Sequence, residues 1–143
     1  MDADTARAAR PIAIARHPIS SVVLPIPVVC FVGALLTDIA YVKSGGDLLW
    51  VNFSSWLIAV GLLSGVLAGV VLLVDNFRGA TVHGGRPFLA LVAAWVAELV
   101  SSFVHTRDGW TAVMPLGLTL SILGAILILA AGWLARHSAE AVR

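Results

Sequence analysis

The chain has 143 residues, of which 59% are hydrophobic and only 12% are charged, and its formal net charge is +1. An average soluble domain is about 25% charged, and a soluble domain of this length cannot bury so much apolar surface. The composition excludes an ordinary cytosolic enzyme, a disordered chain and a disulfide-stabilised secreted module, since Cys30 is the single cysteine. The near-neutral charge gives no indication of nucleic-acid binding. The predicted partner is a lipid bilayer.

Four apolar stretches are long enough to cross a bilayer, whose core of about 30 Å needs roughly 20 helical residues. They cover about 18–41, 50–74, 87–105 and 111–135. Their apolar residues are continuous rather than alternating, which indicates helices and not a β-barrel. The segments between them are short and rich in glycine and polar residues, so consecutive helices are expected to run antiparallel. The sequence predicts an all-α integral membrane protein, an antiparallel four-helix transmembrane bundle.

The basic residues predict how this bundle is oriented. Lys43 and Arg107 fall on one side, and the other side carries Arg7, Arg10, Arg16, Arg78, Arg86, Arg136 and Arg143. The positive-inside rule then places both termini in the cytoplasm. We therefore expect a cytoplasmic segment at 1–17, the four spans at 18–135 and a cytoplasmic tail at 136–143, in a bacterial inner membrane.

Aromatic and small residues add expectations about packing. Tyr41, Trp50 and Trp110 are predicted to form an aromatic belt at the outer interface, and Trp133 one at the inner interface. Rows of small residues allow helices to approach closely in lipid. They occur in the second and fourth spans: Gly61, Gly65 and Gly69, then Gly117, Ser121 and Ala125. These rows hold either this chain's own bundle together or a second subunit against it. Pro25 and Pro27 predict an interrupted helix in the cytoplasmic third of the first span.

Ionisable residues in membrane spans are functional candidates by default, and here they form two sets. The inner set, expected at the cytoplasmic face, consists of His17, Asp75, His83 and His137. Histidines with a carboxylate could bind a divalent metal, and two histidines could bind haem b. His17 and His83 are the candidate ligands, with Asp75 and His137 in support. The alternative is that these residues are ordinary polar residues at helix ends, where His137 would complement the helix dipole.

The outer set consists of Asp38, Glu98 and His105. Glu98 is expected roughly 16 Å above Pro87, close to the middle of the membrane, and His105 lies on nearly the same helix face. Pairing of Glu98 with His105 would suit a proton relay, and Lys43 could neutralise Asp38. The structural alternative is a neutral Glu98 that bonds to a nearby serine, Ser101 or Ser102, and links helices.

Several of these residues together resemble a known family, the bacterial membrane proteins catalogued as domain of unknown function 2231. The resemblance covers nearly the whole chain and lies in His17-Pro18, Pro27, Asp38, Asp75 and His83. It implies a four-helix membrane protein without an agreed activity, whose relatives often look like partners of redox proteins. The family often begins with two His-Pro units three residues apart, and here Ser20-Ser21 replaces the second, which weakens a ligand site at His17 and His83.

Three functions follow as hypotheses. The first is a redox-associated protein that binds haem or a metal through the inner set. The second is a non-catalytic accessory subunit, a homo-oligomer or part of a membrane redox complex, that docks through its glycine rows. The third is a proton-linked carrier that uses Glu98, with Asp38 and His105 as further relay candidates. No motif of an enzyme is present, so a catalytic activity of the chain alone is not expected.

Overall fold

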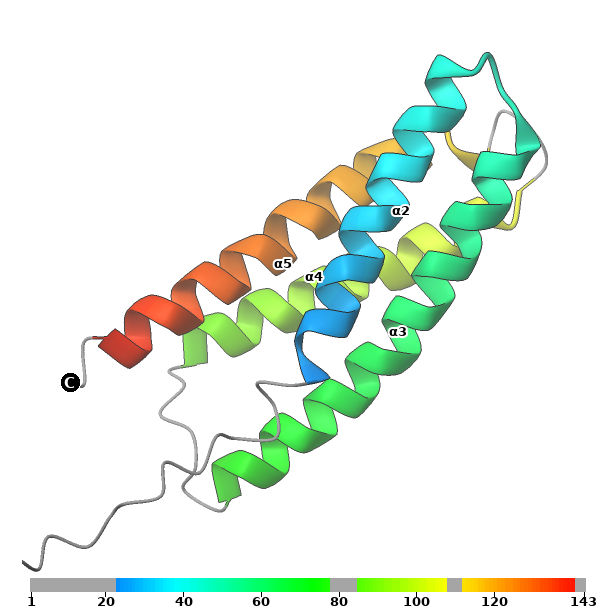
Figure 1. The fold of residues 1–143 in the computed structure, drawn as a ribbon. Helices are drawn as coiled ribbons and strands as arrows, with labels where there is room; N and C mark the ends of the chain where they lie inside the picture. Colours follow the sequence, from blue (N-terminus) through cyan, green and yellow to red (C-terminus); the bar gives the residue numbers. More distant parts are fainter. Residues whose placement is uncertain (1–22, 78–84, 108–111, 141–143) are drawn as a thin grey trace, which may run out of the picture.

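A computed structural model describes residues 23–77, 85–107 and 112–140, and within these ranges the chain is helical apart from short turns. The helices are α2 (Pro25–Lys43), α3 (Leu48–Phe77), α4 (Gly85–His105) and α5 (Leu116–Glu140). All of them are long and apolar enough to span a membrane. In the described part of the chain, the prediction of four helices that are long and apolar enough to cross a membrane is therefore confirmed, and their arrangement is consistent with a four-helix bundle (Figure 1).

Local sequence explains where the helices begin and end. Pro25 and Pro27 lie in the first turn of α2, where a missing backbone N–H breaks no helical hydrogen bond. After α2, Gly45 and Gly46 adopt φ of 77° and 98°, a conformation that side chains with a Cβ rarely adopt. Asp47 then caps α3, since its Oδ1 accepts a hydrogen bond of 2.9 Å from the backbone N–H of Leu49. This turn brings α3 back alongside α2 (Figure 1).

The four helices form a ring in which each packs against two others. α2 contacts α3 and α5, and α4 contacts α5 and α3. The closest association is between α4 and α5, whereas α3 and α4 make the smallest contact of these pairs. The helices α2 and α4 thus lie diagonally across the ring, and polar residues that join them must cross its centre.

The outer surface of the ring is apolar, as lipid contact requires. On α3, large side chains such as Trp56 and Leu63 are 66% and 75% exposed. Trp133 is also exposed, and its place at the inner interface stays a prediction. Trp110 lies outside the described residues. Tyr41, however, is only 1% exposed. Its predicted place in an aromatic belt is wrong, because its position on α2 turns it into the bundle instead of toward the interface.

The glycine row of α3 packs within the chain at two of its three positions. A Cβ at Gly61 would overlap the Phe31 ring of α2, and a Cβ at Gly65 would come within 2.9 Å of the Trp95 indole of α4. Trp95 also donates a hydrogen bond of 3.1 Å from its indole N–H to the carbonyl of Leu62. Gly69 has open space around it. The structure thus gives Gly61 and Gly65 a role inside this bundle.

Candidate functional site: a buried acidic and histidine cluster

A buried carboxylate of α2 is the centre of a polar cluster in the bundle. Asp38 is fully buried, and its Oδ1 lies 3.0 Å from Nε2 of His105 on α4. Its other oxygen, Oδ2, accepts a hydrogen bond of 2.6 Å from the hydroxyl of Ser121 on α5. Both carboxyl oxygens are therefore engaged, which compensates part of the cost of burying this group.

The backbone of α4 fixes the tautomer of His105. Its Nδ1 lies 2.9 Å from the carbonyl oxygen of Ser101, and a carbonyl oxygen can only accept a hydrogen bond. Nδ1 must therefore carry a proton and donate it. The hydroxyl of Ser101 lies 3.3 Å from the same nitrogen. His105 itself is only 6% exposed, so this pattern of bonds lies inside the protein.

The tautomer has a consequence for the contact with Asp38. If Nδ1 carries the proton of a neutral imidazole, Nε2 is an acceptor and would face a carboxylate oxygen that is also an acceptor. The 3.0 Å contact therefore contains a further proton, either on Nε2 of an imidazolium or on the carboxyl group.

Ser54 of α3 fits the first of these arrangements. Its hydroxyl oxygen lies 3.2 Å from Nε2 of His105, and the hydroxyl donates to the carbonyl of Ala34 at 3.4 Å. Because its own proton is directed to Ala34, the oxygen is free to accept from an Nε2–H. Ser54, Ser101 and Ser121 are all fully buried.

Glu98 lies deeper in the bundle than this pair. It is seven residues before His105 on α4, a distance of about 10 Å along the helix. Its side chain is fully buried, and neither Oε1 nor Oε2 has a hydrogen-bond partner. The carboxyl groups of Glu98 and Asp38 are close enough to interact electrostatically. Gly124 of α5 leaves the space for the Glu98 side chain, because a Cβ there would overlap its carboxyl group.

Part of the wall around the cluster is formed at the end of the bundle that carries the 44–47 turn. The segment that leads into α5 contributes Ala112 and Val113, both fully buried. A Cβ at Gly117 would come within 3.2 Å of Cε1 of His105, so α5 begins directly against the imidazole. The backbone N–H of Leu118 donates to the carbonyl of Val113 at 2.8 Å, which fixes this segment to the helix.

The structure brings the outer set together but pairs its members differently from the expectation. His105 bonds to Asp38 and not to Glu98, because the imidazole points to the centre of the ring, where α2 presents its carboxylate. Lys43 is exposed and Asp38 is buried, so Lys43 is not the group that bonds to Asp38. The expected serine bond to Glu98 is also not formed: Ser101 faces His105, and the hydroxyl of Ser102 donates to the carbonyl of Leu99.

The inner set lies mostly outside the described residues. His17 and His83 fall there entirely, and Asp75 is described only as part of the backbone of α3. His137 is exposed near the end of α5 and packs edge-on against Trp133, with ring centroids 4.3 Å apart. Among the residues whose placement is described, no group of three or more His, Cys, Asp and Glu could hold a metal ion. A haem or metal at His17 and His83 stays a prediction.

Three residues that build the site were not predicted to belong to it. Ser121 was interpreted only as a small packing residue, while Ser54 and Gly124 were not singled out. A signal was available for the serines, because a buried Asp38 in an apolar span requires donors from other helices. The sequence offers no comparable signal for Gly124, whose role depends on the direction of the Glu98 side chain.

Comparison with curated proteins and with solved structures found no match. Comparison with family models did, and the match extends over residues 16–140, a range that includes all four helices and the whole polar cluster. The chain therefore belongs to the family described as predicted membrane protein, domain of unknown function 2231.

Proposed function

We propose that this small multi-pass membrane protein is a proton-binding unit, and that its function is linked to protons through Asp38, His105 and Glu98. The observation that carries the proposal is the contact between Nε2 of His105 and Oδ1 of Asp38, which requires a proton between two buried groups. A histidine paired with a carboxylate is a common device for holding and transferring protons.

Charge balance assigns a role to each group. An ion pair of Asp38 and His105 has no net charge, whereas an additional ionised Glu98 would leave one uncompensated charge in a medium of low dielectric constant. The unpartnered oxygens of Glu98 favour the neutral acid, which holds a second proton. Ionisation of Glu98 is then coupled to the charge of the pair.

The proposal favours a binding site over a continuous proton channel. Within the described part of the interior, apolar side chains fill the centre of the bundle around Phe31, Ala94 and Ile128. A proton path needs polar groups or water along its length, and this cluster of buried hydrocarbon offers neither. The site is therefore expected to exchange protons from the end of the bundle at which His105 lies.

Infrared difference spectroscopy of the reconstituted protein between acidic and alkaline buffers tests the proposal. We expect the C=O band of a protonated carboxylic acid, shifted in D2O, which Glu98→Gln removes. Asp47→Asn is the matched control, because Asp47 is exposed in the turn before α3. A band that is the same in Glu98→Gln and in the unchanged protein would contradict the role of Glu98.

Transport measurements separate binding from conduction. In vesicles with an entrapped pH dye and an imposed membrane potential, the unchanged protein should not raise the proton flux above that of empty vesicles. A flux that Glu98→Gln abolishes would show a conducting path and overturn the one-sided site.

We also infer that the helices run antiparallel in a bacterial inner membrane, with both termini in the cytoplasm. The unequal distribution of basic residues supports this orientation. Lys43 is the last residue of α2, Phe77 is the last residue of α3, and both are exposed. The native cysteine, Cys30, is buried. An impermeant maleimide should label Lys43→Cys but not Phe77→Cys from the outside of intact cells. The reverse pattern would invert the orientation.

A further inference from the structure

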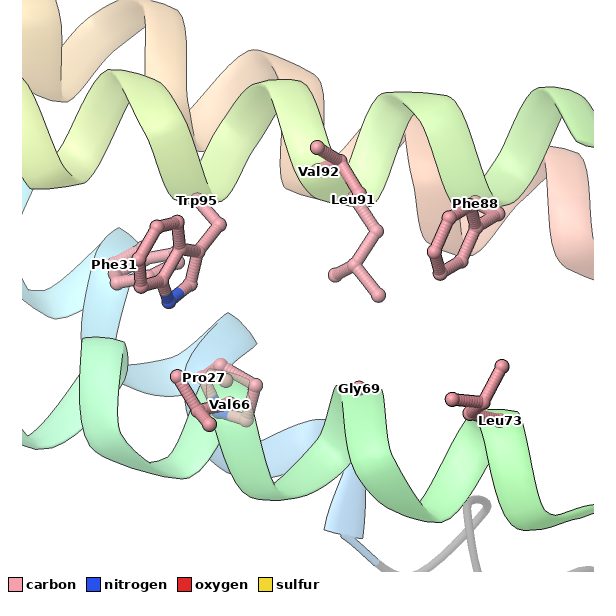
Figure 2. A pocket seen from close by; sticks show the side chains of 10 residues that line it. Pro27, Phe31, Val66, Gly69, Leu73, Phe88, Leu91, Val92 and Trp95 are labelled. Atoms are coloured by element: carbon pink, nitrogen blue, oxygen red, sulfur yellow. The ribbon is translucent and has the colours of Figure 1, made fainter.

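A cavity of about 260 Å³ opens between α3 and α4, away from the polar cluster (Figure 2). Phe31 and Trp95 lie beside each other at one end of it (Figure 2). Leu73 extends from α3 toward α4, and Phe88 and Leu91 extend from α4 toward α3, with open space between them (Figure 2). The remaining lining residues are Pro27, Gly65, Val66, Gly69 and Val92.

The cavity exists because the glycine row of α3 meets α4 at only one position. Gly65 packs against the Trp95 indole, and one turn later Gly69 has no atom within 4 Å of the place where its Cβ would be. The helices therefore touch at Gly65 and diverge beyond it, in agreement with the small contact between α3 and α4.

The chemistry of the cavity selects an apolar occupant. Its lining side chains are hydrocarbon apart from the Trp95 indole, and the indole N–H already donates to the carbonyl of Leu62 at 3.1 Å. A water molecule in a cavity needs two to four polar partners, and the lining side chains offer no free donor or acceptor. Water and polar ligands are therefore disfavoured.

The position and size of the cavity indicate which apolar occupant it takes. Its rim is open, because Val66, Leu73 and Phe88 are 53%, 52% and 47% exposed. All three lie in membrane-spanning helices, so the opening faces the acyl chains of the bilayer. A cavity of this volume does not hold a helix of a second chain, which is about 10–12 Å in diameter. The volume of the cavity is also just below the roughly 300–1,000 Å³ of most ligand pockets, which suits a single acyl chain.

We propose that this cavity binds one acyl chain of a bilayer phospholipid, which enters sideways between α3 and α4. The proposal does not depend on the proton-binding function, since none of the lining residues belongs to the polar cluster. Bound in this way, the acyl chain supplies the packing contacts that α3 and α4 do not make with each other.

Quenching of Trp95 fluorescence by phospholipids with brominated acyl chains tests the proposal, because bromine quenches at contact. The protein used for this test has Trp95 as its single tryptophan, because the other four tryptophans are replaced by phenylalanine. Gly69→Leu fills the cavity, and we expect it to reduce the quenching by at least half. Gly132→Leu is the matched control, since Gly132 on α5 also has open space around it, and it should leave the quenching unchanged.

A second variant keeps the test decisive if Gly69→Leu folds poorly. Leu91→Ala enlarges the cavity and is expected to increase the quenching. The proposal would be overturned if Gly69→Leu and Leu91→Ala were quenched as strongly as the parent protein. It would also be overturned if Gly132→Leu lost as much quenching as Gly69→Leu. If a side chain of a second copy fills the cavity instead, quenching will rise as the protein is diluted with lipid, and that result would also overturn it.

Discussion

The carboxyl group of Glu98 on α4 occupies the space that Gly124 on α5 leaves by having no side chain. The two helices make the most extensive contact of the bundle. Packing against α5, and no hydrogen bond, thus holds this buried acid in place.

Gly124→Ala is therefore expected to destabilise the protein. Overpacking of a close interface usually costs about 1–3 kcal/mol, although alanine would otherwise favour the helix over glycine. Unfolding in mixed micelles with dodecyl sulfate measures the change. Gly132→Ala, at a position with open space, should be neutral or slightly stabilising.

The double variant Glu98→Ala/Gly124→Ala identifies the cause of this loss. Removal of the carboxyl group relieves the overlap, so the double variant should be more stable than the sum of the two single effects predicts. Additive effects would mean that Gly124 matters for another reason.

Replacing either Asp38 or His105 alone should lower the stability of the protein more than replacing both. In Asp38→Asn the amide replaces the charge that faces His105, and loss of one partner of a buried pair costs about 3–5 kcal/mol in soluble proteins. The effect in a bilayer is expected at the lower end, because the unfolded state in the membrane also finds partners. The double variant Asp38→Asn/His105→Gln, analysed in a double-mutant cycle, should recover part of the loss. Independent effects would contradict a shared proton.

Two serines allow a matched test of the hydrogen bond to Asp38. Ser121→Ala removes a 2.6 Å bond to the carboxylate, and hydrogen bonds to charged groups contribute about 1.5–3 kcal/mol. Ser102→Ala removes a bond to the carbonyl of Leu99 within its own helix, which stabilises little. The same unfolding assay should show a loss only for Ser121→Ala, and equal losses would argue against a special role of the cluster.

The glycine row of α3 predicts different effects along one helix. Gly61→Ala meets the Phe31 ring and should lose about 1–3 kcal/mol of stability. Gly69→Ala meets nothing and should gain up to about 1 kcal/mol from helix propensity. If Gly69→Ala instead dissociates an oligomer in analytical ultracentrifugation, the end of the row packs against a second subunit.

The spans could be predicted from sequence because each depends on one chain segment and one property of the solvent. Continuous apolar stretches bounded by polar turns placed the second and third helices close to their observed ranges. Tyr41 was misplaced because its distance along the chain suggests an interface, whereas its direction depends on the rotation of α2.

The outer set was identified correctly as one region, since each residue is too polar for its span. The pairing of Asp38 with His105 could not be predicted, because a helical wheel compares residues of one helix only. The pair crosses the ring between α2 and α4, and its distance depends on the depth and rotation of both helices. The sequence alone favoured Glu98, which shares a helix face with His105.

The unequal lengths of the helices have a consequence for the surrounding membrane. The apolar span of α3 has 27 residues and that of α2 has 19, which correspond to about 40 Å and 29 Å at 1.5 Å per residue. The second value matches a hydrocarbon core of about 30 Å, while the first exceeds it. Hydrophobic mismatch then requires α3 to tilt or the bilayer to thicken around it. Bilayer thickness is thereby coupled to the angle between α3 and α4, and so to the width of the cavity that they enclose.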